Sequence, residues 1–375
     1  MRSDKRFEAK GIDPLTNKRK SYYSRVSQAD ADLQARKSYG IQVDRSVNSF
    51  YLGGFIPAIM SRSKNWRIQV AWAMKQIWSP AIGSKDIDSL TRTDIQATIN
   101  DANKRYAPKS VSSAYKVIHA LLELAEADGL TERNPCIKIR LPEQGPSTTI
   151  ALDFTQLAHL LKHCQPLIKP GVLLAGGASL RLSEAVGAML GDIDKDGALN
   201  VQRQVLQLNG EIEVTTTLKT PQSYRSIPLP EELRTMMLES RASTNGLWIF
   251  ADTVGGYIKP KNVRRELSIA CERAGMGHYE DHETKKDKQG KPVQVFIPLV
   301  TFHELRHTFI SLMENELEIP RRIVEMLAGK AAKGKMGTYS HADMAQMTRA
   351  MNRYGERLST ELTTELTTEL RVSGL

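Results

Sequence analysis

The sequence predicts a mainly α-helical protein that contains a small antiparallel β-sheet. Apolar residues recur at helical spacing through much of residues 46–190 and again through 261–357. Between these stretches, short runs of Leu, Val and Ile surround Asn209–Gly210, a dipeptide typical of β-hairpins. Residues 141–149 (LPEQGPSTT) have the Pro, Gly and small polar residues of a linker, which indicates two folded units on either side.

The composition favours a folded protein with a polyanionic partner. The chain has 375 residues, of which 41% are hydrophobic and 25% are charged, values that are ordinary for globular proteins. Lys and Arg total 52 against 42 Asp and Glu, which gives a formal net charge of +10 at pH 7. This excess favours binding to nucleic acid or to an acidic membrane surface.

Several classes of protein are disfavoured by features that the sequence lacks. No run of about 18 apolar residues occurs, so we expect no membrane span. The N-terminal MRSDKRFEAK lacks the apolar core of a secretion signal. The three cysteines, Cys136, Cys164 and Cys271, are too widely spaced for a disulfide framework or a zinc cluster, which indicates a reducing cytosol.

Residues 1–45 are predicted to form a small basic module. The first 25 residues hold eight Lys and Arg against three acidic residues. A turn is expected at residues 11–17 between short extended pieces, and a short helix at 28–37. The alternative is a solvated, partly disordered tail, because the segment is too short to bury a sizeable core. If the module binds DNA, the candidate residues are Lys18, Arg19 and Lys20.

Residues 46–140 are predicted to form an all-helical domain. Apolar residues at helical spacing mark a short helix around residues 55–60 and longer ones at 66–78 and 110–128. Another helix is expected to begin near Thr91–Thr93, with Thr93 and Gln96 as its capping box.

Residues 150–356 are predicted to form a mixed domain. Helical patterns cover residues 153–165, 171–190, 261–274, 303–316, 320–328 and 342–357. An antiparallel sheet of about three strands is expected from the apolar runs at 199–201, 205–208, 212–214 and 227–229. Residues 280–291 are expected to be a charged insertion. Residues 357–375, with their STEL, TTEL, TTEL repeat, are expected to be a low-complexity tail with no face for core packing.

The first candidate site residues are charged side chains in unusual surroundings. Arg181 stands in an apolar segment (LLAGGASLRLSEAVGAML) and needs a partner or an anion there. Glu184, three positions later, lies on the same helical face, so a plain salt bridge is the alternative. Lys219 stands at a second predicted turn, where an ordinary solvated lysine is the alternative.

The remaining candidates lie further along the mixed domain. His303 and Arg306 share one helical face in the run Thr301–Thr308 (TFHELRHT), for which an ordinary polar helix start is the alternative. An arginine can hold two oxygens of a phosphate, and a histidine can move protons near neutral pH. Tyr339 lies in the Gly- and Lys-rich segment Lys330–His341, where a tyrosine is otherwise a packing or surface residue.

Together these residue types suffice to attack a phosphodiester without a metal ion. A tyrosine hydroxyl can act as the nucleophile and form a covalent phospho-enzyme. Two guanidinium groups can hold the non-bridging oxygens and stabilise the charge of the transition state. A general acid protonates the leaving oxygen, and a base assists a phenol whose ordinary pKa is about 10.

In order and spacing, these segments resemble the tyrosine recombinase family, and within it the phage-type integrases. The similarity covers about residues 46–356, and the helical domain 46–140 resembles the family's SAM-like core-binding domain. The matching signatures are Arg181–Glu184 with Leu190–Ile193, Lys219 on a hairpin, His303–Thr308, and Gly337–His341. The implied fold is a helical core-binding domain followed by a mixed α+β catalytic domain at 150–356.

The resemblance implies a role for each matching residue. Arg181 and Arg306 would clamp the scissile phosphate, and Lys219 would protonate the departing 5′-oxygen. His303 would assist proton transfer at Tyr339, which would form a 3′-phosphotyrosine. Two supporting residues are implied, Glu184 and His307. No metal and no cofactor are implied.

One position departs from the family pattern. The family usually has a Gly-His or Gly-Trp pair nine residues before the tyrosine, and here the pair is Gly329–Lys330. A lysine can still donate to a phosphate oxygen, although as a mobile point charge. We therefore expect Lys330 to be a substitute donor.

The implied function is a site-specific DNA recombinase, or integrase, that needs neither metal nor ATP. Its implied partner is double-stranded DNA with specific attachment sites, bound by a homotetramer, with accessory DNA-bending or excision-directing proteins. The expected location is the cytoplasm of a bacterium or a phage-infected host, at the nucleoid. The alternatives are a DNA-relaxing enzyme similar to type IB topoisomerases and a catalytically dead DNA-binding regulator on the same scaffold.

Two other patterns have simpler interpretations. His159, His163 and Cys164, and separately His278 and His282, have spacings seen in metal sites, but neither set supplies enough ligands. Surface or core histidines are the better interpretation. A stripe along residues 344–354 predicts a packing face or a contact with a neighbouring protomer, and consists of Met344, Met347, Met351 and Tyr354.

Overall fold

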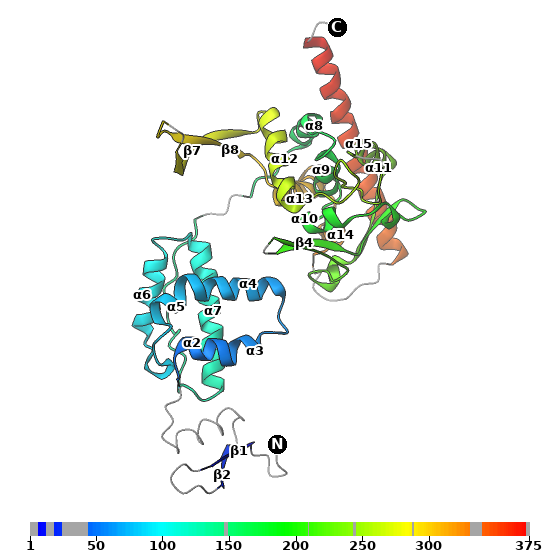
Figure 1. The fold of residues 1–375 in the computed structure, drawn as a ribbon. Helices are drawn as coiled ribbons and strands as arrows, with labels where there is room; N and C mark the ends of the chain where they lie inside the picture. The colour runs from blue at the N-terminus through cyan, green and yellow to red at the C-terminus, as the bar shows by residue number, and fades with distance from the viewer. Residues whose placement is uncertain are drawn as a thin grey trace. The chain divides into compact units, whose positions relative to one another are not determined.

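The computed structural model describes residues 7–12, 19–24, 44–145, 149–208, 210–242, 245–286, 289–330 and 340–372. The chain divides into two compact units, Met1–Ser147 and Thr148–Leu375 (Figure 1). Four sequence predictions fall wholly or mostly outside the described residues: the turn at 11–17, the helix at 28–37, Lys18, and the nucleophile Tyr339.

The N-terminal basic segment contains an antiparallel pair of strands. β1 (Phe7–Ile12) pairs with β2 (Arg19–Ser24), so that Phe7 lies opposite Ser24 and Ile12 opposite Arg19. The predicted short extended pieces are therefore confirmed. Two of the candidate DNA-binding residues, Arg19 and Lys20, lie on β2.

The rest of the first unit is helical over the part that the structure describes. The first helical stretch consists of α2 (Val47–Phe50), η1 (Tyr51–Phe55) and α3 (Ile56–Ala58). The second stretch consists of α4 (Lys64–Ala73), η2 (Met74–Trp78) and α5 (Ser79–Ile82). They are followed by η3 (Ile87–Ser89), α6 (Arg92–Ala102) and α7 (Pro108–Ala127).

Trp78 anchors the core of this helical unit. Its side chain is fully buried, and its indole N–H donates to the carbonyl of Ala114 on α7 at 2.9 Å. The indole thus brings its large apolar area into the core without leaving a buried donor unpaired. The capping box of α6 is formed by Thr91 and Asp94, not by Thr93 and Gln96 as predicted. Asp94 reaches back to the Thr91 backbone N–H at 2.9 Å, so the helix begins two residues earlier.

The second unit contains most of the helices of the described chain. Its N-terminal half holds α8 (Phe154–His163), α9 (Lys169–Val172), η4 (Leu173–Gly177), α10 (Leu182–Gly187) and η5 (Leu190–Asp192). Its later helical elements are η6 (Pro221–Ser223), α11 (Glu231–Glu239), α12 (Pro260–Arg273), α13 (Phe302–Ser311), η7 (Leu312–Glu316), α14 (Arg321–Ala328) and α15 (His341–Val372).

The predicted continuous helix over 171–190 is wrong, because the chain breaks between η4 and α10. Ser179 has a φ of 58°, in the left-handed region that ends helices. The chain then turns, and Arg181 becomes the residue immediately before α10. This break moves Arg181 from a helix interior to a helix start.

The predicted three-stranded sheet is instead two separate antiparallel pairs. β3 (Ala198–Val201) pairs with β6 (Arg225–Pro228), and β4 (Gln204–Leu208) pairs with β5 (Glu211–Thr215). The break between β3 and β4 falls at Gln202 and Arg203, whose side chains both bind the buried carboxylate of Asp192. The hairpin predicted at Asn209–Gly210 is confirmed by the β4–β5 pairing.

The charged insertion predicted at 280–291 is a β-hairpin. β7 (Gly277–Lys286) pairs with β8 (Pro292–Pro298), and Figure 1 shows this hairpin extending outward from α12. Tyr279 and Phe296 lie directly opposite one another, with ring centroids 5.4 Å apart in an edge-to-face arrangement. Aromatic cross-strand pairs of this kind stabilise strand pairing, and they outweigh the charged composition that indicated an insertion.

The expectation of a tail without a packing face is also wrong, because α15 continues to Val372. In the predicted stripe, Met347, Met351 and Tyr354 are fully buried in their own unit and Met344 is partly buried against the same core, so the stripe is a packing face. The Tyr354 hydroxyl donates to the carbonyl of Gly176. Further along, Leu358 is buried and Leu362 packs against the same core. The first repeat therefore places Leu362 on the inner face of the helix.

Candidate active site

Arg181 occupies the turn before α10 and points its side chain toward β6. Its guanidinium donates to the Glu184 carboxylate at 2.7 Å and to the Ser223 hydroxyl at 3.3 Å. The Arg181 backbone N–H donates to the other Glu184 oxygen at 3.0 Å. The side chain is 27% exposed, so it is oriented by partners and still reachable from solvent. Such an arginine can bind an anion without losing the pairing that orients it.

Glu184 is the buried acid that holds this part of the site together. One carboxylate oxygen accepts from Arg181 and the other from Arg225, at 3.1 Å. Burial alone raises the pKa of Glu184, but the charges of Arg225 and Arg181 and the Arg181 N–H outweigh burial, so its pKa lies below the ordinary value. The carboxylate is therefore ionised at neutral pH, where it orients two arginines.

Arg306 reaches the same place from α13. Thr301 and Glu304 cap the start of this helix, and Arg306 lies one turn further, with only 3% of its surface exposed. Its guanidinium donates to the carbonyls of Ser179 and Ala328. Burial, and then the charges of Arg181 and Arg225, lower the pKa of Arg306 to about 9. The guanidinium is thus protonated at neutral pH and close enough to Arg181 for the two to repel, an arrangement that an anion between them would relieve.

His303 and His307 stack on the exposed side of α13. Their ring centroids are 4.7 Å apart, in an edge-to-face arrangement. Burial, and then the neighbouring charges of His307, Arg306 and Arg181, lower the pKa of His303 below its ordinary value. The pKa of His307 is lowered by burial and then by Lys330 and Arg306. Both imidazoles are therefore neutral at pH 7, the form in which His303 can accept a proton.

Lys330 lies beside this group, at the end of α14. The helix ends at Gly329, whose φ of 58° is left-handed, and the Lys330 backbone N–H then donates to the carbonyl of Glu325 at 3.0 Å. A side chain at position 329 would meet the carbonyl of Gln222 and the side chain of Arg225, so a glycine is required there. The exposed Lys330 side chain is close enough to His307 to lower the pKa of that imidazole.

Lys219 is exposed on the loop between β5 and η6. Its neighbour Thr220 shares a hydrogen bond of 3.1 Å with Ser223, which in turn accepts from Arg181. The loop that carries Lys219 is thus connected to the arginine site through Thr220 and Ser223. Tyr339 lies outside the described residues, so its distance from the arginines stays untested.

The structure thus brings together Arg181, Glu184, Arg306, His303, His307 and Lys330. Sequence reasoning missed Arg225, a fully buried residue of β6 that also contacts Glu184. Its sequence context, Tyr224–Arg225–Ser226, resembles an ordinary exposed strand end. Arg225 is the first residue of β6 and lies opposite Val201 of β3, a position that no sequence motif marks.

The histidine sets considered as metal ligands have other partners. His159 contacts the carbonyl of Ala274 at 3.1 Å, and His163 contacts that of His159 at 2.9 Å. His278 contacts Glu280 at 2.7 Å. Over the described ranges, no group of three or more His, Cys, Asp or Glu side chains is placed to hold a metal ion.

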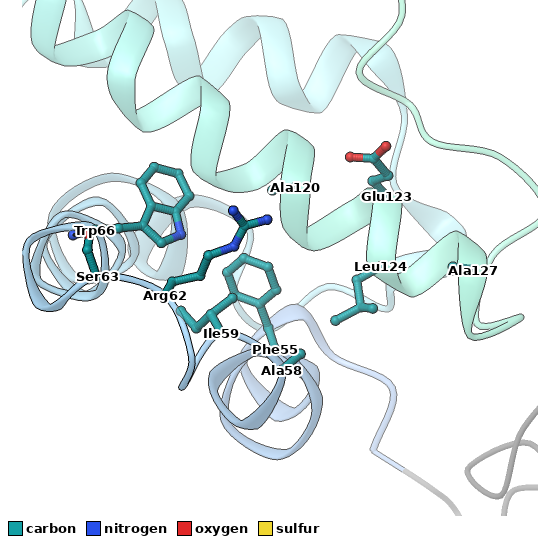
Figure 2. Close-up of a pocket in the computed structure, with 10 residues that line it drawn as sticks. All are labelled: Phe55, Ala58, Ile59, Arg62, Ser63, Trp66, Ala120, Glu123, Leu124 and Ala127. Atoms are coloured by element: carbon teal, nitrogen blue, oxygen red, sulfur yellow. Dashed lines mark hydrogen bonds between the residues drawn. The ribbon is translucent and has the colours of Figure 1, made fainter. Parts of the chain in front are cut away.

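The first unit has a groove of its own, with a volume of about 760 Å³, between α3, the start of α4 and α7. Figure 2 shows the Arg62 side chain reaching from the turn before α4 toward α7. The groove combines apolar walls with two opposite charges, and its main lining residues are Phe55, Ile59, Trp66, Leu124, Arg62 and Glu123. No residue predicted from the sequence to be catalytic lines it. None of the helices in the described parts of the chain is long and apolar enough to cross a bilayer.

Sequence comparisons find recombinases and integrases, whereas no family model matches the chain. The chain is 26% identical over 251 residues to a tyrosine recombinase XerC-like protein of Caldanaerobacter subterraneus, covering 57% of this chain and 64% of that protein. It is 27% identical over 175 residues to the integrase of Mycobacterium phage D29, covering 45% of each. The chain thus spans less than two thirds of the length of these two relatives. A third relative, the transposase of transposon Tn916 from Enterococcus faecalis, is 23% identical over 302 residues, which cover 76% of this chain and 73% of that one.

Solved structures with the same fold come from the same group of proteins. The Tn1549 transposon integrase in complex with transposon right end DNA superposes with a TM-score of 0.61 at 17% identity, covering 81% of this chain and 94% of that one. Lambda integrase, solved as a tetramer bound to a Holliday junction, gives a TM-score of 0.57 at 16% identity over 91% of this chain and 97% of that one. The predicted fold, mainly helical with small antiparallel sheets, is therefore confirmed. In sequence and in fold, the chain is thus similar to tyrosine recombinases and integrases.

Proposed function

We propose that the protein is a site-specific DNA recombinase that cuts and rejoins duplex DNA through a 3′-phosphotyrosine. The observation that carries this proposal is the convergence of Arg181 and Arg306 from distant parts of the sequence, with His303 beside them. Two protonated guanidiniums that repel one another form a site for an anion with two or more oxygens, such as a phosphodiester. The relatives named as recombinases and integrases support the same chemistry.

In the proposed reaction the Tyr339 hydroxyl attacks phosphorus, and the bond from phosphorus to the 5′-oxygen breaks. The phenolic proton passes to neutral His303, and Lys219 gives a proton to the departing 5′-oxygen. Arg181 and Arg306 hold the non-bridging oxygens, whose charge grows in the transition state. The phosphotyrosine conserves the energy of the ester bond, so the 5′-hydroxyl of another strand can reverse the step without ATP.

Lys330 is proposed to donate to a phosphate oxygen from the end of α14. Its exposed side chain lies next to His307, on the same side of the site as His303. An ammonium group supplies charge without the fixed geometry of an imidazole or indole N–H. His307 and Glu184 are proposed to support the reacting groups and not to react.

The proposed substrate is double-stranded DNA that contains a specific attachment site. The formal charge of +10 supports a partner rich in phosphate, and binding should weaken steeply as salt is raised. Because two duplexes must each be cut on both strands, four copies of the chain are expected on a pair of sites. Acting on chromosomal or phage DNA, the protein would work in the cytoplasm at the nucleoid, with accessory DNA-bending or excision-directing proteins as further expected partners. Lys18, Arg19 and Lys20 are proposed to contact accessory DNA sites.

A nicked suicide duplex that carries the attachment site tests this proposal. The short fragment 3′ to the cut diffuses away and traps the covalent protein–DNA complex, which is then resolved on a denaturing gel. We expect trapping by the wild type and none by Tyr339→Phe. Absence of trapping by the wild type would favour a DNA-binding regulator. Relaxation of supercoiled plasmids of any sequence, without joining of paired sites, would favour a topoisomerase.

A further inference from the structure

Arg225 is the most completely buried charge of the second unit's candidate site, with a side chain that is 0% exposed. Its guanidinium donates to four acceptors: the carbonyls of Leu327 at 2.8 Å, Ser223 at 3.0 Å and Ser179 at 3.2 Å, and the Glu184 carboxylate at 3.1 Å. A planar fork of donors fixed by four acceptors has little freedom to move.

Each of these acceptors lies in a segment that carries a residue of the proposed reaction. Ser179 and Glu184 flank Arg181. Ser223 ends the loop that carries Lys219, and its hydroxyl accepts from Arg181. Leu327 belongs to the last turn of α14, three residues before Lys330. Arg225 therefore touches three of the segments that must be aligned for cleavage.

The contact with α14 is shared with Arg306. The last carbonyls of a helix have no partner within it, and they lie at the negative end of the helix dipole. Arg225 takes the carbonyl of Leu327, and Arg306 takes that of Ala328. Two arginines thus fix the end of the helix from which Lys330 extends, and one of them is itself a proposed phosphate clamp.

Stability alone does not explain a charge in this position. Removing an arginine from water costs several kcal/mol, and a buried ion pair replaced by apolar residues of similar volume is often equally stable. An apolar residue could fill the space but could not hold four acceptors. The geometry therefore favours a role in alignment.

We propose that Arg225 is a positioning residue of the cleavage reaction, which orients Glu184 toward Arg181 and fixes the end of α14 that presents Lys330. It does not touch the DNA. This inference rests on the proposed recombinase function, so its test needs one measurement with DNA and one without.

The DNA measurement compares Arg225→Met and Arg225→Lys with a matched control, Arg203→Met. Arg203 also pairs with a buried carboxylate, that of Asp192, and among the described residues it makes no hydrogen bond or ion pair with the site residues. At saturating suicide duplex, we expect Arg225→Met to slow covalent trapping by about 100-fold, the size of effect seen when a positioned donor is lost. Arg225→Lys should recover part of the rate, and the Kd for DNA should stay within about threefold, because the residue acts after binding. Arg203→Met should trap at nearly the wild-type rate even if its thermal stability falls equally.

The measurement without DNA is amide hydrogen exchange at Gly329 and Lys330, which donate to the carbonyls of Met326 and Glu325. We expect both amides to exchange faster in Arg225→Lys than in the wild type or in Arg203→Met. Arg225→Lys keeps the positive charge, so the exchange measurement can be made on this variant even if Arg225→Met does not fold. Unchanged exchange at these amides, or unchanged trapping by the Arg225 variants of an active wild type, would overturn the positioning role. Failure of the wild type to trap DNA would instead refute the recombinase function, while the exchange result still decides whether Arg225 fixes the end of α14.

Discussion

The carbonyl of Ser179 accepts a hydrogen bond from the Arg306 guanidinium, and the backbone conformation of Ser179 makes this possible. Its φ of 58° turns the chain between η4 and α10 and directs the carbonyl toward the two buried arginines. The Ser179 side chain is fully buried, and within the described residues its hydroxyl has no hydrogen-bond partner. The position of this one carbonyl therefore coincides with a strained backbone conformation and, within the described residues, with a buried hydroxyl that has no partner.

Ser179→Gly should preserve or raise the stability of the second unit, and Ser179→Val should lower it. Glycine adopts a positive φ without cost and removes the buried hydroxyl, whereas a β-branched residue is a steric outlier there. We expect the free energy of unfolding in urea to change by less than about 1 kcal/mol for glycine and to fall by about 2 kcal/mol or more for valine. Equal stability of the two variants would mean that position 179 is not left-handed.

Arg306→Lys should bind the suicide duplex but cleave it at least about 100-fold more slowly, because a lysine cannot hold two oxygens with a fixed fork. It also cannot reach the carbonyls of Ser179 and Ala328 at once. Binding is measured by mobility shift and cleavage by covalent trapping, and Arg306→Ala should show the same separation with a larger loss. Cleavage at the wild-type rate in either variant would contradict the clamp role.

Lys330→His should retain or improve cleavage, and Lys330→Ala should reduce it by about 10- to 100-fold, as expected for loss of one donor. The histidine would restore the residue type usual at this position in the family. Single-turnover trapping measures both variants, with thermal unfolding as the check on folding. If Lys330→His folds normally and abolishes cleavage, the interpretation of Lys330 as a substitute donor is wrong.

The helices that the sequence predicted correctly are those whose apolar periodicity is long and uninterrupted. α7 has Val117, Ile118 and Leu121 on one buried face, and its predicted and observed bounds differ by at most two residues. The prediction of a continuous helix over 171–190 failed because the chain turns at Ser179, whose left-handed conformation accompanies hydrogen bonds from Arg225 and Arg306 to its carbonyl. The effect of a contact with a side chain distant in sequence cannot be predicted from local helix propensity.

In the candidate site, too, residues in local sequence motifs could be predicted, whereas residues that act through long-range contacts could not. Arg181, His303 and Arg306 could be predicted because they lie in short motifs with recognisable spacing. Arg225 could not, because its role comes from burial and from four acceptors in separate segments. The β7–β8 hairpin was missed for a related reason, since its stabilising pair, Tyr279 and Phe296, becomes visible only once the strands are in register.

The stability of the second unit should fall as the pH is lowered from 7 to about 5.5. The pKa values of His303 and His307 are lowered in the folded protein, by burial first and then by neighbouring positive charges. An unfolded histidine has a pKa of about 6.5, so below this pH the unfolded chain binds more protons than the folded one, and the free energy of unfolding decreases. Glu184, with its lowered pKa, adds a separate loss only at more acidic pH.

Urea unfolding at several pH values measures this effect, and the double variant His303→Gln, His307→Gln provides the comparison. The variant should lose part of the slope between pH 7 and 5.5, because two of the groups that take up protons only on unfolding are gone. A slope identical to that of the wild type would show that neither histidine is perturbed by the arginines and Lys330.

The start of the C-terminal tail, which consists of Leu358 and the first repeat, should contribute to the stability of the second unit as part of α15. Leu358→Ala should lower the free energy of unfolding by about 2–5 kcal/mol, because the side chain is fully buried. Leu362→Ala should cost about 1 kcal/mol, since Leu362 is only partly buried against the core. Thr363→Ala, at an exposed position of the same helix, is the control and should change stability by less than about 0.5 kcal/mol. If all three variants unfold at the same urea concentration, the repeats do not pack, and the low-complexity interpretation of the tail would stand.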